Sequence, residues 1–122
     1  MACPTERSFS AAYADIYAQA RAALIDTARR RRFIAYSDLV RRVTAFPLRP
    51  DDPRLHGILD EISRAEDAAG RGLLSIVVVH KTGDMMPGKG FFDLARFLGR
   101  DVADTEKFWS KEVAHVFAAW KG

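Results

Sequence analysis

The sequence has a single cysteine, Cys3, among its 122 residues. One cysteine excludes an internal disulfide and a zinc site built from several cysteines, so we expect a reducing, cytoplasmic environment. A long apolar run is also missing, because the longest one, at 73–79, is far shorter than the roughly 20 residues of a membrane-spanning helix. Residues 1–31 contain no apolar block of the kind found in signal peptides. We therefore expect neither secretion nor a membrane partner.

Motifs of enzymes are scarce as well. No serine has the G-x-S-x-G flanks of a nucleophile elbow, and His56, His80 and His115 do not follow a standard zinc spacing. The stretch Gly83-Asp-Met-Met-Pro-Gly-Lys-Gly90 nearly matches a P-loop, but Gly90 stands where that motif needs a hydroxyl group for magnesium. We therefore expect no catalytic residue, no metal site and no cofactor.

Two interpretations of this glycine-rich turn stay open. Gly88, Lys89 and Gly90 precede a predicted helix, and free backbone N–H groups beside a lysine can hold a phosphate there. Alternatively, the glycines serve a turn with positive φ angles, and Lys89 is simply solvated.

Positive charge is concentrated in the first half of the chain. The net charge is +3, but residues 1–50 contain nine arginines against four acidic residues, a balance of +5. Residues 51–122 contain ten basic and twelve acidic residues, a balance of −2. A basic segment suits an anionic partner, most commonly nucleic acid. The alternative interpretation is that these charges only keep the protein surface soluble.

Hydrophobic spacing and capping residues predict five helices. The first begins after Ser8 or Ser10 and ends in Arg29-Arg-Arg-Arg32, where the helix dipole favours some of the positive charge. The others are expected over 38–44 with Ser37 as the N-cap, from Pro53 to 69 after Asp51 or Asp52, over 91–98, and from Asp101 or Asp104 onward. Trp109 and Trp120 share a face of the last helix, which we expect to pack against the first helix or to form a homodimer contact.

The strand signals are few. Residues 73–80 are apolar on both faces and predict a buried strand, while 33–36 predicts a shorter one. Met85 and Met86 are candidates for a short return strand that Pro87 ends. We therefore predict a mainly helical α+β fold in one domain over 1–122, with a mobile segment at 1–7, a small antiparallel sheet, and long N- and C-terminal helices.

The order of elements in 33–90 resembles a winged helix-turn-helix. Tyr36-Ser-Asp-Leu would open the motif, 53–69 would be its recognition helix, and 73–90 its wing. The DNA-binding domain of alkylguanine-DNA alkyltransferases and alkyltransferase-like proteins has a similar run. The Pro-Cys-His-Arg string of that family is absent, and the nearest stretch here is Val78-Val-His-Lys81. The resemblance therefore implies a DNA-binding fold, and neither alkyl transfer nor a base-flipping site.

These patterns favour a small, non-enzymatic nucleic-acid-binding protein, with DNA as the expected partner, acting as a monomer or a homodimer. The predicted recognition helix carries four acidic residues outside its apolar stripe, at Asp60, Glu61, Glu66 and Asp67, which phosphates would repel. The predicted contacts are therefore basic residues elsewhere and at the start of that helix: Arg29, Arg30, Arg31, Arg32, Arg41, Arg42, Arg49, Arg54, His56, Lys81 and Lys89. The alternative is a protein-interaction module that uses the acidic third helix.

Overall fold

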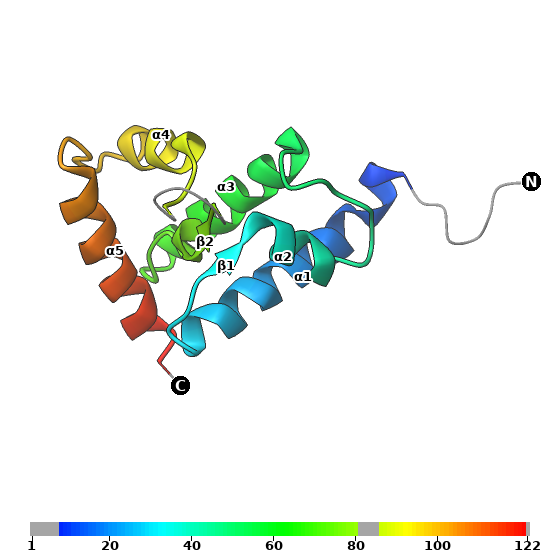
Figure 1. The fold of residues 1–122 in the computed structure, drawn as a ribbon, viewed down its shortest axis with the longest axis horizontal. Coiled ribbons are helices and arrows are strands. Elements are labelled where there is room, and N and C mark those ends of the chain that lie inside the picture. The colour runs from blue at the N-terminus through cyan, green and yellow to red at the C-terminus, as the bar shows by residue number, and fades with distance from the viewer. Residues whose placement is uncertain (1–7, 81–85, 122) are drawn as a thin grey trace, which may run out of the picture.

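The computed structural model describes residues 8–80 and 86–121, which form five α-helices, one 3₁₀ segment and two very short strands (Figure 1). The mainly helical α+β character is thus confirmed, whereas the expectations for 1–7, Lys81 and Met85 lie outside the described residues. In order, the elements are α1 (Phe9–Arg29), β1 (Ile34–Ala35), α2 (Tyr36–Arg42), α3 (Pro53–Ala68), the 3₁₀ segment η1 (Leu74–Val77), β2 (Val78–Val79), α4 (Lys89–Phe97) and α5 (Thr105–Ala119).

Side-chain caps explain where three of the helices begin. The side chains of Ser8, Asp52 and Asp104 each accept a hydrogen bond from a first-turn N–H group of α1, α3 and α5, as the sequence predicts. The prediction for α2 is wrong. That helix begins at Tyr36, without a side-chain cap, and the Ser37 hydroxyl is buried with no hydrogen-bond partner in the described part of the chain.

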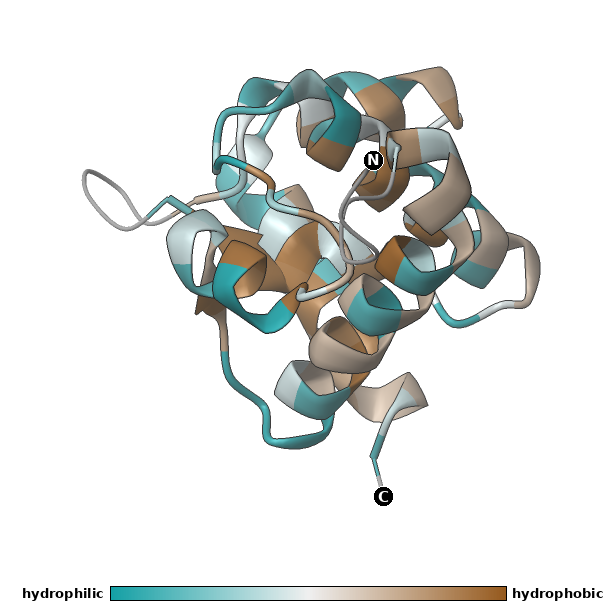
Figure 2. Ribbon diagram, turned by 90° about the vertical axis from the view of Figure 1, so that its right-hand side faces the viewer, coloured by the Kyte–Doolittle hydropathy of each residue, from teal (hydrophilic) through white to brown (hydrophobic). Residues whose placement is uncertain are grey.

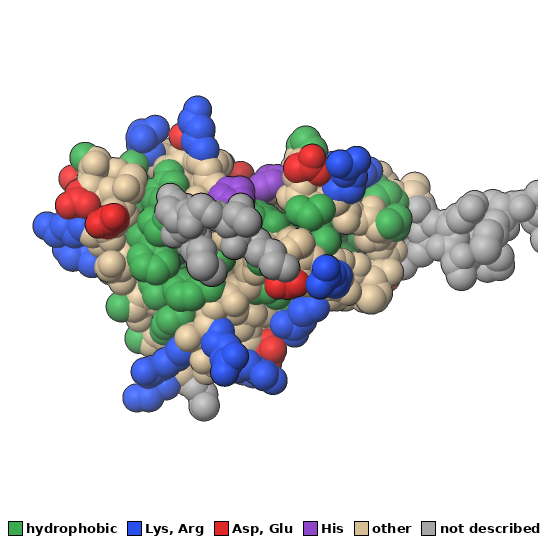
Figure 3. Space-filling model, in the orientation of Figure 1, with side chains coloured by type: hydrophobic (Ala, Val, Ile, Leu, Met, Phe, Trp, Pro, Cys, Tyr) green, Lys and Arg blue, Asp and Glu red, His purple; other side chains and the backbone are tan. Residues whose placement is uncertain are grey.

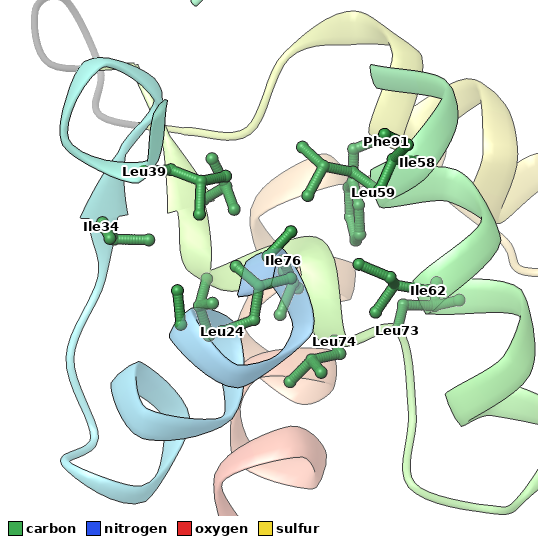
Figure 4. Packing of buried hydrophobic residues seen from close by; sticks show 14 of the residues in the cluster. Leu24, Ile34, Leu39, Ile58, Leu59, Ile62, Leu73, Leu74, Ile76 and Phe91 are labelled. Carbon is green, nitrogen blue, oxygen red and sulfur yellow. The ribbon is translucent and has the colours of Figure 1, made fainter. Parts of the chain in front are cut away.

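The centre of the fold is η1 together with β2. Every residue from Leu73 to Val79 is buried, and η1 packs against α1, α3 and α5. In Figure 4 the side chain of Ile76 lies at the middle of this cluster, with Leu24 beside it and Leu74 below, and Figure 2 shows hydrophobic positions gathered in the interior. The predicted strand over 73–80 is therefore wrong for most of its length, because a turn of helix lets four successive buried side chains reach helices on different sides.

The sheet is parallel, which corrects the predicted antiparallel one. Ile34 pairs with Val78 and Ala35 with Val79. No return strand occurs among the described residues. A single backbone hydrogen bond, from the His80 N–H to the Met86 carbonyl at 3.1 Å, connects the end of β2 to the residues before α4. Residues 43–52 connect α2 to α3, a longer link than the three- or four-residue turn of a helix-turn-helix. The winged-helix resemblance stays a prediction.

The central segment is hydrogen-bonded by buried side chains. The Glu112 carboxylate accepts from the Leu73 N–H at 2.9 Å. The Ser63 hydroxyl accepts from the Ser75 N–H at 2.9 Å and donates to the Ser75 hydroxyl at 2.6 Å. Because a buried N–H without a partner costs about 1–3 kcal/mol, these contacts make burial of the segment possible.

An ion-pair cluster centred on Glu66 of α3 connects α1 to the end of α5. Glu66 is only 2% exposed and binds the guanidinium groups of Arg21 and Arg71, and both of these lie over the ring of Trp120. Burial raises the pKa of Glu66, but the hydrogen bonds from Arg71 and Arg21 outweigh it, so its pKa is below the usual range. The expected packing of α1 against α5 is confirmed.

Two glycines of the link between α3 and η1 provide a test of this packing. Gly70 and Gly72 both have positive φ angles, of 82° and 85°. A Cβ at Gly70 would meet nothing within 4 Å, whereas one at Gly72 would lie 2.6 Å from His115 and 2.8 Å from Glu112.

We expect Gly70→Ala to lower the free energy of unfolding by about 1 kcal/mol, the cost of the left-handed backbone alone. Gly72→Ala adds the clash with α5 and should lower it by about 2–4 kcal/mol. Urea-induced unfolding of both variants measures the difference. Equal losses would show that close contact with α5 is not a constraint on the central segment.

Candidate nucleic-acid interface

The C-terminal end of α1 holds an arginine in an unfavourable backbone conformation. The Arg31 N–H donates to the Ala28 carbonyl and the Arg32 N–H to the Thr27 carbonyl, which closes the helix in a Schellman motif. Arg31 has a φ angle of 54°. Glycine is the usual residue at this position, because a side chain costs about 1–2 kcal/mol in the left-handed region.

Most of the positive charge at this end has no internal partner. Arg29, Arg31 and Arg32 are exposed, and none of them forms an ion pair with a described residue, in contrast to Arg30, which binds Asp26 at 3.2 Å. Figure 3 shows Lys and Arg side chains gathered along the lower edge, where α1 ends and the C-terminus lies in Figure 1. Arg31 also lines a shallow hollow together with Lys121, which follows α5. We call Arg29, Arg31, Arg32 and Lys121 the basic end.

The other predicted cationic contacts are dispersed and mostly paired. Arg42 lies near the end of α1, because it binds Asp26 together with Arg30. Lys89 lies at the start of α4, on the opposite edge of the view in Figure 1. The pairs, each within 4 Å, are Arg41 with Asp38, Arg42 with Asp26, Arg49 with Asp51 and Arg54 with Asp52. A pre-formed ion pair reduces the net attraction for an external phosphate, so these residues are weaker candidates.

An aromatic surface, which was not predicted from the sequence, adjoins the basic end. Phe33 directly follows Arg32, is 39% exposed, and stacks on Trp109 with ring centroids 5.4 Å apart and planes at 21°. Its ring is also 5.7 Å from Phe117, which lines the same hollow as Arg31. The available signal was the position of a phenylalanine immediately after four arginines.

The acidic residues of α3 are less available than predicted. Glu66 is buried, so its placement outside the core is wrong. Glu61 accepts a hydrogen bond from the Tyr13 hydroxyl, and Asp67 forms an ion pair with Arg100. Asp60 is half-buried, and burial raises its pKa. The face that an interaction module would use is therefore largely occupied by internal contacts.

A second cluster joins the predicted residues His56 and Gly88 to Tyr36 and His80, which were not predicted as site residues. The ring of Tyr36 contacts those of His56 and His80, with centroids 5.2 and 5.1 Å away. The Gly88 N–H donates to the Tyr36 hydroxyl at 3.3 Å, which joins the expected phosphate turn to this cluster. Burial raises the pKa of Tyr36, and the Gly88 hydrogen bond offsets part of that rise. We call Tyr36, His56, His80 and Gly88 the tyrosine–histidine cluster. Histidine side chains are visible between α4 and α3 in Figure 3.

Comparison with protein-family models, curated proteins and solved structures found no match. Within 8–80 and 86–121, no three His, Cys, Asp or Glu side chains are placed to hold a metal ion. None of the helices in these ranges is long and apolar enough to span a bilayer.

The strain at Arg31 can be measured directly. We expect Arg31→Gly to raise the free energy of unfolding by about 1 kcal/mol, because glycine adopts the left-handed region without a Cβ penalty. Arg31→Ala removes the same charge but keeps a Cβ, and should bring no such gain. Thermal and urea unfolding of the two variants separate backbone strain from charge repulsion, and equal stabilities would contradict the strain.

Proposed function

We propose that this protein binds nucleic acid through the basic end, without catalysing a reaction. The observation that carries the proposal is Arg31, an exposed arginine without a described partner, held where glycine would be more stable. Local strain of this kind is often retained where a side chain has a task in binding. With Arg29 and Arg32 beside it, Arg31 offers three free guanidinium groups to successive phosphates.

The aromatic surface beside these arginines favours a single strand. Bases of single-stranded DNA or RNA can stack on Phe33, which already rests on Trp109, while the phosphates contact the basic end. Stacking of this type contributes about 1–3 kcal/mol per base and is available to every base. Bases inside a duplex are stacked on each other and cannot use the ring.

A protein-interaction role for the acidic third helix has less support. Its carboxylates at Glu61, Glu66 and Asp67 have partners within the chain. A partner protein would have to displace those contacts.

Salt dependence tests the phosphate contacts. For a single-stranded oligonucleotide, the logarithm of the binding constant should fall linearly with that of the salt concentration, with a slope of about −0.7 per contact. Replacing Arg29, Arg31 and Arg32 together by Gln should reduce the slope by about two and weaken binding by at least tenfold at low salt. Fluorescence anisotropy measures both quantities.

A matched control removes the same charge elsewhere. Arg96, Lys107 and Lys111 are exposed on α4 and α5, and their replacement by Gln also lowers the net charge by three. This variant should retain most of the affinity and the slope. Absence of binding by the wild-type protein at low salt would refute the proposal, and equal losses in the two variants would refute the assignment to the basic end.

Phe33 provides a separate test of strand preference. Phe33→Ala should weaken binding of a single strand about tenfold, which corresponds to one lost stacking contact, and leave duplex binding nearly unchanged. Exposed Phe97 on α4 offers the control, because Phe97→Ala removes an equal ring away from the basic end. If both replacements act alike, Phe33 is not a stacking site.

A further inference from the structure

A hollow of about 440 Å³ runs along one face of α5, beside the basic end. We call it the α5 hollow. Its volume falls in the range of roughly 300–1,000 Å³ that is usual for ligand sites. The α5 residues that line it recur at spacings of three and four, so they share one side of the helix over about two turns. They are Ser110, Val113, Ala114, Phe117 and Ala118.

The lining of the α5 hollow suits a flat ring attached to an anionic backbone. Its apolar floor includes half-buried Phe117, and the small side chains of exposed Ala114 and Ala118 leave the surface of the helix open. Arg31 and Lys121 also line the hollow, where α1 and α5 end near each other in Figure 1. Among the described residues that line it there is no acid. A nucleobase can therefore lie on the floor while its phosphate contacts the two cations.

A hollow of similar size on α1 is less suited to this ligand. It measures about 460 Å³ and is lined by Arg29 of the basic end, but also by Asp26 and Arg21. The Arg21 guanidinium already binds the Glu66 carboxylate at 2.8 Å. Asp26 places a carboxylate in the same hollow as Arg29, which weakens the attraction for a phosphate there. The α5 hollow is therefore the better place for a nucleotide.

The aromatic surface continues into the α5 hollow through Phe117. The ring of Phe117 has its centroid 5.7 Å from that of Phe33, and the two ring planes are inclined at 50°. If one base stacks on Phe33 and the next lies against Phe117, the two bases are inclined to each other as well. The strand must then lose the stacking between these neighbours. Purines stack on each other more strongly than pyrimidines, so this loss is smaller for a pyrimidine strand.

We propose that the α5 hollow binds the base next to the one that stacks on Phe33, and that the protein therefore selects pyrimidine-rich single strands. The inference rests on the proposed function, to which it adds a second base site and a sequence preference. The preference comes from the geometry of the two rings and from the cost of unstacking the strand. It requires no hydrogen bond to the edge of a particular base.

Two strands of equal length test the preference. Fluorescence anisotropy compares an oligothymidylate with an oligoadenylate, both single-stranded DNA, at the same low salt concentration. The two strands have the same phosphate charge, so a difference in affinity reports on their bases. We expect the oligothymidylate to bind about fivefold more tightly, because adenine bases must give up stronger stacking on each other.

Filling the α5 hollow tests where the second base lies. Replacement of Ala114 and Ala118 together by Leu should weaken oligothymidylate binding about tenfold, the loss of one base contact, and abolish the preference. The salt slope should stay that of the wild type, because no cation is removed. The control places the same pair on α1, with Ala14→Leu and Ala18→Leu; both alanines are exposed and four residues apart. This control also narrows the hollow on α1 and should bind as the wild type does.

The outcomes separate this inference from the proposed function. Salt-dependent binding with equal affinity for the two strands, or unchanged binding after the α5 hollow is filled, would overturn the inference and leave the proposed function standing. Equal losses in the two leucine variants would overturn the assignment to α5. No binding of either strand by the wild-type protein would overturn both. Far-UV circular dichroism confirms that each variant is folded, and Ala114→Leu alone replaces the double variant if that one does not fold.

Discussion

The fold depends on burying one short segment, Leu73–Val79, from every side. A segment of this kind has few ways to hydrogen-bond its backbone, because β1 offers only two residues for pairing. Other donors of the segment are satisfied by a 3₁₀ turn and by the side chains of Glu112 and Ser63, which belong to different helices. Removing either side chain would leave a buried N–H without a partner, so the positions of α3 and α5 are coupled to the central segment.

This arrangement also positions the tyrosine–histidine cluster. The same segment that fills the core continues into β2, and its parallel pairing with β1 places His80 and Tyr36 at one edge. An antiparallel pair would have put the two ends at opposite edges of the sheet. A core requirement therefore brings together Tyr36 and His80, which are more than forty positions apart in the chain.

Internal ion pairs determine which charges remain available. Glu66 binds Arg21 and Arg71, and Asp67 binds Arg100 of the α4–α5 link. Asp26 binds Arg30 and Arg42, and Asp38 binds Arg41. A protein of net charge +3 can thus present a locally stronger positive surface, because seven of its acids form ion pairs with arginines whereas Arg29, Arg31 and Arg32 form none with described residues. These arginines lie at the C-terminal end of α1, where the negative end of the helix dipole stabilises positive charge.

Local signals in the sequence were enough to predict the five helices, most of their caps, the arginine cluster at the end of α1 and the burial of 73–79, because capping and hydrophobic spacing act over a few residues. They could not predict the 3₁₀ turn, since a run that is apolar on all sides suits a strand and a buried helical turn equally. Parallel pairing, the burial of Glu66, and the meeting of Phe33 with Trp109 and of Tyr36 with His56 and His80 were decided by tertiary structure alone. Each of these requires segments distant in the chain to be brought together, and nothing in the neighbouring residues records which partner will be there.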